Sequence, residues 1–471
     1  MAGHSHRENR EEMDELLSQY EQLRTGSAPS YLEEEAFERI IDHFQQSEQA
    51  GKALEAALIA VERYPYSAAL LIRQADMLIV HTRYKEALKV LDQAELLDSR
   101  DINIFILRTD AYLALDQAEK AVPLLQTALI QFEGEEKVEL LFELADVYDD
   151  YEDFEKVFDC LREILQVDPL NEEALYRICF WTDFTGRNEE GVRIHQQILD
   201  EHPFSELAWF NLGAAYQGLK LYEKSIDAYK YAVAIEEKFD YAYRNMGDAF
   251  IRLRKYRDAI EVLERVHELA KPEDVIYEAI GYCYEKLKQP AQARLQYRKA
   301  SHLRPEDSRL LYKIACTYFS EAKWEAAYKQ LDTAIRIHKN DFDYQVLAGQ
   351  CCEQMGQYAE AIQHFLQAVR LKPRNMGGWE ALVHGLYDAS QFEEAVLQSE
   401  LALKATRNRP LFLYYRAAAL FAAGRAKEAL LQLEQALVTN SKLMKKFVTI
   451  RPEALQNPKV VDLLARFKRV R

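Results

Sequence analysis

The stretch Ala208–Ile235 reads AWFNLGAAYQGLKLYEKSIDAYKYAVAI, and its pattern of residue types recurs elsewhere in the chain. An aromatic residue, a Leu-Gly pair and a Tyr come first, and the small residues Ser225 and Ala232 follow. Residues 241–266, YAYRNMGDAFIRLRKYRDAIEVLERV, repeat the pattern with other side chains. Self-similarity at a fixed period is the signature of a repeat architecture, so this period decides the fold class.

Repeats of 34 residues extend from this stretch in both directions. The predicted first residues of the repeats are Glu34, Ala68, Ile102, Val138, Glu172, Glu206, Asp240, Asp274, Ser308, Phe342, Met376 and Pro410. The third repeat is two residues longer, and we expect the excess in a loop, FEGEEK, at residues 132–137. We predict an N-terminal segment and capping helix at residues 1–33, a twelve-repeat array at 34–440, and basic C-terminal capping helices at 441–471.

The residue types that recur at fixed positions of the repeat, which we call its columns, indicate how its helices pack. Counted from the first residue of each repeat, positions 20 and 27 are each Ala in nine of twelve repeats, and position 8 is Gly or Ala in eight. Position 17 is aromatic in seven. Small residues let two helices approach closely, and large residues between them fill the gaps. Each repeat is therefore predicted to be a helical hairpin that buries its apolar face only against its neighbours.

The columns W-x-x-L-G-x-x-Y, then Ala, aromatic, Ala and Pro, resemble the tetratricopeptide repeat. The match is carried by Trp209, Leu212, Gly213, Tyr216, Tyr229 and Ala232. The resemblance covers Glu34 to about Ser441 and implies an all-α fold, a right-handed superhelical solenoid of about twelve helical hairpins. The stretch KKFVTIRPEALQNPKVVDLLARF, residues 445–467, is similar to the C-terminal cap of long cytosolic tetratricopeptide proteins of Bacteroidetes-type bacteria.

Composition and charge narrow the classes of partner. The formal net charge of −17 repels phosphate backbones, which argues against nucleic acid. No run of 18 apolar residues occurs, so no membrane insertion is expected. The six Cys form no C-x-x-C motif and fall in predicted helices, which predicts reduced thiols and a cytoplasmic location. Residues 441–471 carry nine Lys and Arg against two Asp and Glu, so this tail contacts the acidic body or an acidic partner, or is a solvated terminus.

The sequence carries no signature of catalysis. It has no phosphate-binding glycine loop, no H-E-x-x-H and no G-x-S-x-G, so we expect no catalytic residues, no cofactor and no metal. The interpretation is a non-catalytic scaffold that binds peptide or helical segments of partner proteins in a concave groove. The alternatives are a regulatory or chaperone-adaptor array that controls an associated enzyme, and an enzyme with a site built into the groove. The identity of the partner and the oligomeric state are not fixed by the sequence.

The resemblance also indicates which residues face a partner, because the first helix of each repeat lines the concave face of such arrays. Repeat 4 then presents an acidic patch of Glu139, Glu143, Asp146, Asp149 and Asp150. Aromatic and Arg side chains anchor interfaces most often. The candidate partner-binding residues are Tyr176, Arg177, Phe180, Phe210, Asn211, Tyr241, Arg244, Asn245, Tyr282, Arg309, Tyr312 and Lys313.

Some tetratricopeptide domains hold the C-terminal carboxylate of a peptide in a five-residue clamp. The matching positions in repeats 7–9 are Arg244, Asp248, Ala279, Arg309 and Lys313. Three cations agree in sign with the clamp, whereas Asp248 and Ala279 replace its two Asn. Two interpretations stay open: a site for an anionic or C-terminal peptide at the three cations, or salt bridges from these cations to carboxylates of the groove such as Asp248.

Overall fold

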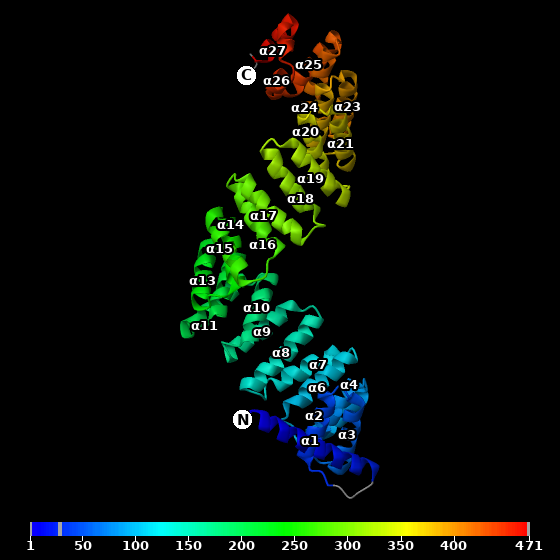
Figure 1. The fold of residues 1–471 in the computed structure, drawn as a ribbon, viewed down its shortest axis with the longest axis vertical. Coiled ribbons are helices and arrows are strands. Elements are labelled where there is room, and N and C mark those ends of the chain that lie inside the picture. The colour runs from blue at the N-terminus through cyan, green and yellow to red at the C-terminus, as the bar shows by residue number, and fades with distance from the viewer. Residues whose placement is uncertain (1, 27–30, 469–471) are drawn as a thin grey trace. The chain divides into compact units, whose positions relative to one another are not determined.

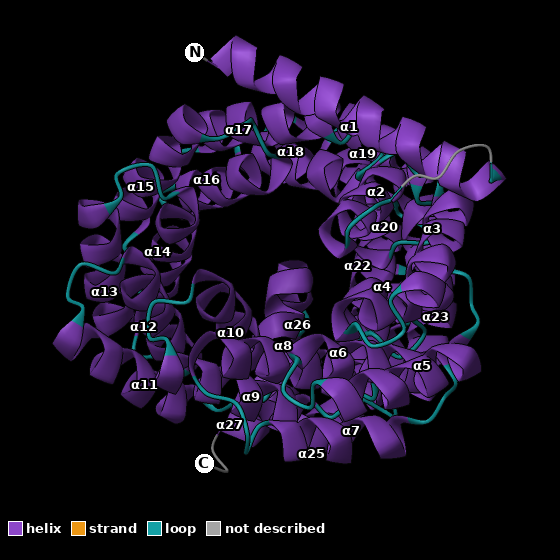
Figure 2. Ribbon diagram, turned by 90° about the horizontal axis from the view of Figure 1, so that it is seen from below, coloured by secondary structure: helices purple, strands orange, loops and turns teal. Residues whose placement is uncertain are grey.

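The computed structural model describes residues 2–26 and 31–468. Residues 1 and 27–30 of the predicted N-terminal segment, and residues 469–471 of the predicted C-terminal cap, lie outside the described residues. Within the described ranges the chain forms helices and loops and no strand (Figure 2). It divides into two compact units, the first ending at Phe239 and the second beginning at Asp240.

The first unit consists of helices that follow one another as hairpins (Figure 1). Its elements are α1 (Ala2–Thr25), α2 (Glu34–Gln46), α3 (Ala50–Arg63), α4 (Ala68–Val80), α5 (Tyr84–Leu97), α6 (Ile102–Ala114), α7 (Ala118–Ala128), α8 (Gly134–Asp150), α9 (Phe154–Val167), α10 (Glu172–Phe184), α11 (Asn188–Glu201), α12 (Glu206–Gly218) and α13 (Tyr222–Ile235).

The second unit continues the same hairpin pattern and ends in shorter helices. Its elements are α14 (Asp240–Arg252), α15 (Tyr256–Leu269), α16 (Asp274–Lys286), α17 (Pro290–Leu303), α18 (Ser308–Ser320), α19 (Trp324–Ile337), α20 (Phe342–Gln354), α21 (Tyr358–Leu371), α22 (Met376–Asp388), α23 (Phe392–Ala405), α24 (Leu411–Ala422), α25 (Ala426–Asn440), α26 (Met444–Ile450) and α27 (Pro458–Lys468), with 3₁₀ turns at Ser441–Leu443 and Pro452–Gln456.

The helix starts follow the predicted repeat register closely. In ten of the twelve repeats the first helix begins at the predicted first residue. Helix α24 begins at Leu411, one residue late, because Pro410 is its N-cap. Helix α8 begins at Gly134 instead of Val138. The expected loop at residues 132–137 is therefore wrong: its second part forms the first turn of a 17-residue helix. Glu135 and Glu136 favour that turn, because carboxylates stabilise a helix N-terminus.

Close helix contacts explain the small-residue columns. Ala259 and Ala293, both at position 20, are fully buried. At position 8, a Cβ added to Gly213 would lie 2.6 Å from Cε1 of Tyr229, and one added to Gly281 would lie 2.6 Å from Cε1 of Tyr297. Real Cβ atoms do not approach so closely, so the aromatic ring of the second helix occupies the space that the glycine leaves.

Every repeat crosses from its first to its second helix through the same backbone conformation. The residue at position 15 has a positive φ in all twelve repeats. Three of these residues are glycines, Gly186, Gly356 and Gly424, and the other nine are Glu48, Thr82, Asp116, Glu152, Lys220, Arg254, Lys288, Ala322 and Ser390. The left-handed region is unfavourable for residues with a Cβ, so these nine turns hold local strain.

The ends of the array are covered by helices. In the first unit Tyr20 of α1 is buried and its ring lies 5.9 Å from that of Phe44. In the second unit Phe447 of α26 and Val460 of α27 are fully buried in the same core cluster as α24 and α25. Lys446 pairs with Glu380 at 2.7 Å and Arg451 donates a hydrogen bond to Tyr387 at 3.0 Å. The basic tail thus contacts the body of its own chain.

Candidate partner-binding surface

An aromatic stripe runs along α10, on the inner side of the first unit. Figure 2 shows α8 and α10 on the inner side of this unit, with α9 and α11 outside them. Tyr176, Phe180 and Phe184 recur every four residues and so share one helix face. Their exposed fractions are 59%, 60% and 57%. We call these three residues the aromatic stripe.

Two rings of the stripe, Phe180 and Phe184, rest on the buried ring of Trp181. Phe180 and Phe184 stack with their centroids 5.8 Å apart, and Phe180 also meets the edge of Trp181 at 4.8 Å. Trp181 is buried and stacks on Phe154 of α9 at 5.1 Å. These contacts hold the rings of Phe180 and Phe184 in place, so little conformational entropy would be lost when a partner binds them.

Arg177 is held beside the stripe rather than free. It pairs with Asp146 of α8 and, at 3.4 Å, with Glu173 of its own helix. Its guanidinium also lies 5.6 Å from the ring centroid of Phe142. The pair with Asp146 fixes α8 against α10. It also means that Arg177 brings no net positive charge to this surface.

Carboxylates of successive first helices crowd together next to α8. Burial raises the pKa of Glu143 to about 7, and the charges of Asp110, Asp146 and Glu139 add to this effect. Burial and the charge of Asp76 likewise raise the pKa of Asp110. Like charges raise the pKa of a carboxyl group because they disfavour its ionised form. The predicted acidic patch is thus part of a wider cluster that includes α4 and α6.

The two candidates on α12 lie deeper than predicted. Phe210 is half-buried, with its ring 5.7 Å from Tyr229 and 5.0 Å from Phe239. Asn211 is 2% exposed, and its Nδ2 donates a hydrogen bond of 2.7 Å to the carbonyl of Leu175. The inclusion of Asn211 among the partner-facing residues is therefore corrected, because its amide serves contact between neighbouring repeats.

The three candidate cations of the second unit are each paired with carboxylates. Arg244 pairs with Glu273 at 2.5 Å and with Asp240 at 3.0 Å, and this pairing lowers the pKa of Glu273. Lys313 pairs with Glu278. Arg309 pairs with Asp307 at 2.9 Å, and its side chain is 74% exposed. The interpretation as salt bridges fits these contacts, although through other carboxylates than Asp248. A site for anionic peptides at these cations is not what the structure favours.

The remaining candidates of the second unit do not form a common patch. Tyr241 is exposed, with the Arg244 guanidinium 5.7 Å from its ring centroid. Tyr282 is half-buried under Lys286, at 4.8 Å, and Tyr312 stacks on Tyr344 at 5.1 Å. Asn245 is half-buried on α14. Among the described candidate residues, only those of α10 form an exposed cluster.

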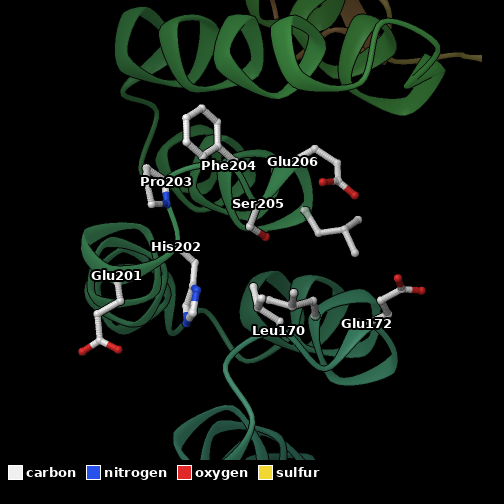
Figure 3. Close-up of a pocket in the computed structure, with 10 residues that line it drawn as sticks. Leu170, Glu172, Glu201, His202, Pro203, Phe204, Ser205 and Glu206 are labelled. Carbon is white, nitrogen blue, oxygen red and sulfur yellow. The ribbon is translucent and has the colours of Figure 1, made fainter.

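A pocket of about 370 Å³ lies at the other end of α10 from Phe184. Its walls come from the segment around Leu170 and from the connection between α11 and α12, including His202 and Phe204. Figure 3 shows Glu172, Glu201 and Glu206 with their carboxylates directed away from the pocket. The polar side chains that remain at the pocket are His202 and Ser205, and the Ser205 hydroxyl already accepts a hydrogen bond from Ala208 N at the start of α12, so we assign no small-molecule site here.

Glu353, His384 and Asp388 of the second unit place three possible metal ligands within 4.8 Å of one another. His384 Nδ1 lies 3.1 Å from Asp388 and 3.5 Å from Glu353. These hydrogen bonds raise the pKa of His384 to about 10. A protonated imidazole already joins the two carboxylates, so we interpret the group as an ion-pair network.

Phe184 occupies another inward-facing position of repeat 5 in the sequence, and the structure places it on the same exposed face as Phe180. Asp110 was missed, although position 9 is Asp in each of the first four repeats: Asp42, Asp76, Asp110 and Asp146. A comparison of the charged residues at the same position of successive repeats would have predicted this cluster of carboxylates.

Comparisons with known proteins were made on sequence and on structure. Residues 297–368 match the family model described as anaphase-promoting complex, cyclosome, subunit 3. Residues 244–308 and 207–239 match two tetratricopeptide repeat models. No curated protein matches the sequence. Of the helices among the described residues, none combines the length and apolarity that crossing a bilayer requires.

The solved structures that are similar to this chain include the following three. YrrB, described as a TPR protein with an unusual peptide-binding site, has 16% identity over 40% of this chain and 96% of its own, with a TM-score of 0.36. A chain of the Cut9-Hcn1 hetero-tetramer of APC/C has 12% identity over 83% and 97%, with a TM-score of 0.35. The C-terminal part of a TPR repeat-containing protein from Cytophaga hutchinsonii has 18% identity over 54% and 99%, with a TM-score of 0.45.

Three observations agree with one another: the helical hairpins of 34 residues, the small residues at the helix contacts, and the matches to two repeat models at residues 207–239 and 244–308. The chain therefore contains tetratricopeptide repeats, which the repeat models match at residues 207–239 and 244–308.

Proposed function

We propose that the protein is a non-catalytic scaffold that binds a peptide or helical segment of a partner protein on the inner faces of its first helices. Repeat arrays of this kind serve as protein-interaction scaffolds in general. The observation that carries the more specific proposal is the aromatic stripe, because three rings on one helix remain more than half exposed. Exposed aromatic patches on a folded protein mark interaction sites.

The length of the stripe fits this mode of binding. From Tyr176 to Phe184 it extends over eight residues of helix, or about 12 Å at 1.5 Å per residue. About two turns of a partner helix, or about four residues of an extended peptide, would cover that length. The array is thus proposed to bind a short segment here rather than a whole globular face.

The predicted cytoplasmic location belongs to the same proposal. All six Cys are free, and Cys160, Cys283, Cys351 and Cys352 are buried. Burial raises the pKa of Cys160 to about 12, so its thiol has little reactive thiolate at neutral pH. Inert, unpaired thiols fit a reducing compartment.

A peptide-display selection tests the proposed surface. Peptides selected from a random library on the wild-type protein would be measured by fluorescence anisotropy against the double variant Phe180→Ala/Phe184→Ala. We expect more than about tenfold weaker binding, because aromatic anchors dominate interface energies. Phe204→Ala is the matched control, since Phe204 is 82% exposed but lies on the connection between α11 and α12. Selected peptides that bind the double variant as tightly as the wild type would refute the proposal.

A further inference from the structure

The aromatic stripe also carries information on the chemistry of its partner, through the charges that border it. This inference rests on the proposed function, because it concerns what binds to the same surface. Glu173 precedes Tyr176 by three residues and Asp183 follows Phe180 by three, so both carboxylates flank the stripe on α10. Both are exposed.

Helix α8 borders the stripe with further carboxylates. Asp146 of α8 contacts Arg177 of α10. Asp149 and Asp150 lie one turn beyond Asp146, as Phe180 lies one turn beyond Arg177. Both aspartates are exposed and stand on the same side of α8 as the contact with α10. The rings therefore lie between carboxylates of two helices.

The basic residue next to these carboxylates offsets only part of their charge. Arg177 is the only Lys or Arg of α10, and it is already shared between Asp146 and Glu173. Further along the inner face, Glu143 has its pKa raised to about 7 by burial and by neighbouring carboxylates. An ionised carboxylate is stabilised when it gains a cationic neighbour. This face therefore favours the binding of a positively charged segment.

We propose that the segment bound by the aromatic stripe is a basic amphipathic one, with aliphatic or aromatic side chains on the rings and Lys or Arg side chains directed to the carboxylates of α8 and α10. Exposed ring faces also attract cations directly, which suits the same partner. An acidic segment would meet like charges on both sides of the rings, and such juxtaposition opposes binding. A neutral segment would gain only the apolar contact.

Three peptides that differ only in charge separate these cases. Each has about 16 residues, long enough to form a helix on a surface, with the same Leu and Phe face. Their polar faces carry Lys, Gln or Glu. Anisotropy titrations at about 50 mM and about 300 mM salt should rank affinity as Lys above Gln above Glu. Salt should narrow the difference, because exposed charges are screened within about 10 Å at moderate ionic strength.

Two protein variants locate the effect. Asp149→Asn/Asp150→Asn should weaken binding of the Lys peptide by about 3- to 10-fold and leave the Gln peptide unchanged, since exposed ion pairs are individually modest. The matched control is Glu135→Gln/Glu136→Gln on the same helix. It removes the same charge about 20 Å from Asp149, more than two Debye lengths away at physiological salt, and should change neither affinity. Helicity and melting temperature of each variant would be checked by circular dichroism.

Each outcome decides one of the two proposals. Equal affinities for the three peptides, all lost in Phe180→Ala/Phe184→Ala, would overturn the basic partner and keep the proposed surface. Preference for the Glu peptide would do the same. Equal weakening of the Lys peptide by the Asp149/Asp150 and Glu135/Glu136 pairs would also overturn it, because it would show only general attraction to an acidic protein. Peptides that bind without regard to Phe180 and Phe184, or none that bind, would overturn the proposed function itself.

Discussion

At the scale of single residues, Glu143 shows how an acidic residue beside the proposed binding surface can oppose stability. Its folded-state pKa of about 7 lies above the ordinary 4.5. The folded state therefore holds a proton that the unfolded state has lost between these pH values, and stability falls as the pH rises from about 4.5 to about 7. Above pH 7 the ionised, half-buried carboxylate remains unfavourable.

Glu143→Gln should stabilise the protein at pH 8 and not at pH 5. At full burial a shift of this size corresponds to about 3 kcal/mol, and half-burial reduces it to about 1–2 kcal/mol. Urea midpoints at the two pH values would measure the difference, with Glu135→Gln as an exposed control on the same helix. A gain that is the same at both pH values would contradict the assignment to this ionisation.

His384 differs from Glu143 in that its charged form stabilises the fold, although stability again falls as the pH rises. Hydrogen bonds to Asp388 and Glu353 raise its pKa from 6.5 to about 10. The stability that this imidazolium contributes is fully present below about pH 6.5 and is lost as the pH rises toward 10. His384→Gln should therefore cost about 1–2 kcal/mol at pH 6, allowing for the exposed part of the ring, and clearly less at pH 9.

Thermal midpoints of wild type and His384→Gln at the two pH values would test this. The exposed His302 supplies the control variant, His302→Gln. If the gap between wild type and His384→Gln widened toward pH 9, the bridging role of the protonated ring would be wrong.

The candidate residues also show which properties of the site could be predicted from the sequence and which could not. The position of Arg244, Lys313 and Arg309 on first helices followed from the period alone. Their neutralisation by carboxylates was one of two interpretations, but the partners Glu273, Glu278 and Asp307 were not predicted, because the pairing depends on rotamers. Lys313 and Glu278 are 35 residues apart, one repeat plus one, so pairing across repeats could have been inferred from the columns.

At the scale of the helical element, the repeat register was predictable because each hairpin buries its small residues against a helix. Gly281 and Ala293 illustrate this contact, since both face the packed interior of α16 and α17. The start of α8 was not predictable in the same way. There the local charges of Glu135 and Glu136 extend the helix beyond the repeat pattern. An insertion of this kind cannot be predicted from the residue types at the repeat positions.

Added volume at the helix contact should therefore destabilise the array. Gly281→Ala places a Cβ 2.6 Å from the ring of Tyr297, and Ala293→Leu adds three carbons at a fully buried position. Each should cost about 1–3 kcal/mol by overpacking. Denaturant midpoints would measure the loss.

Gly51 is the matched glycine for this comparison. It lies in helix α3 with nothing within 4 Å of an added Cβ. Gly51→Ala should raise stability by up to about 1 kcal/mol, because alanine is the better helix former. A gain in stability for Gly281→Ala similar to that for Gly51→Ala would mean that helix propensity, and not the contact with Tyr297, decides the result.

At the scale of the whole molecule, the C-terminal helices are predicted to act as a cap. Leu433 and Leu437 of α25 are buried in the cluster that Phe447, Val460, Leu463 and Leu464 complete. Each of these four side chains contributes about 1.5–3 kcal/mol through burial. Deletion of residues 441–471 should expose the apolar side of α25 and promote association.

Light scattering after size exclusion would detect that association, and the thermal midpoint should fall. The variant Lys446→Ala/Arg451→Ala separates packing from charge. It removes the contacts to Glu380 and Tyr387 but keeps the apolar cap, so it should stay in the same oligomeric state as wild type. A truncated protein as soluble and as stable as the full chain would make the tail an appendage.

The residues with left-handed backbone conformation between paired helices are positions at which substitution can raise the stability of the array. Nine of these twelve positions carry a side chain where glycine would fit without strain. Each replacement, such as Lys220→Gly, relieves about 1–2 kcal/mol of backbone strain, partly offset by the greater freedom of glycine in the unfolded chain. Eight of these positions lie outside the repeats that carry the aromatic stripe and its charged border, the exception being Glu152, two residues from Asp150. At those eight positions, thermal tolerance can be adjusted in small, nearly independent steps while partner choice is left alone.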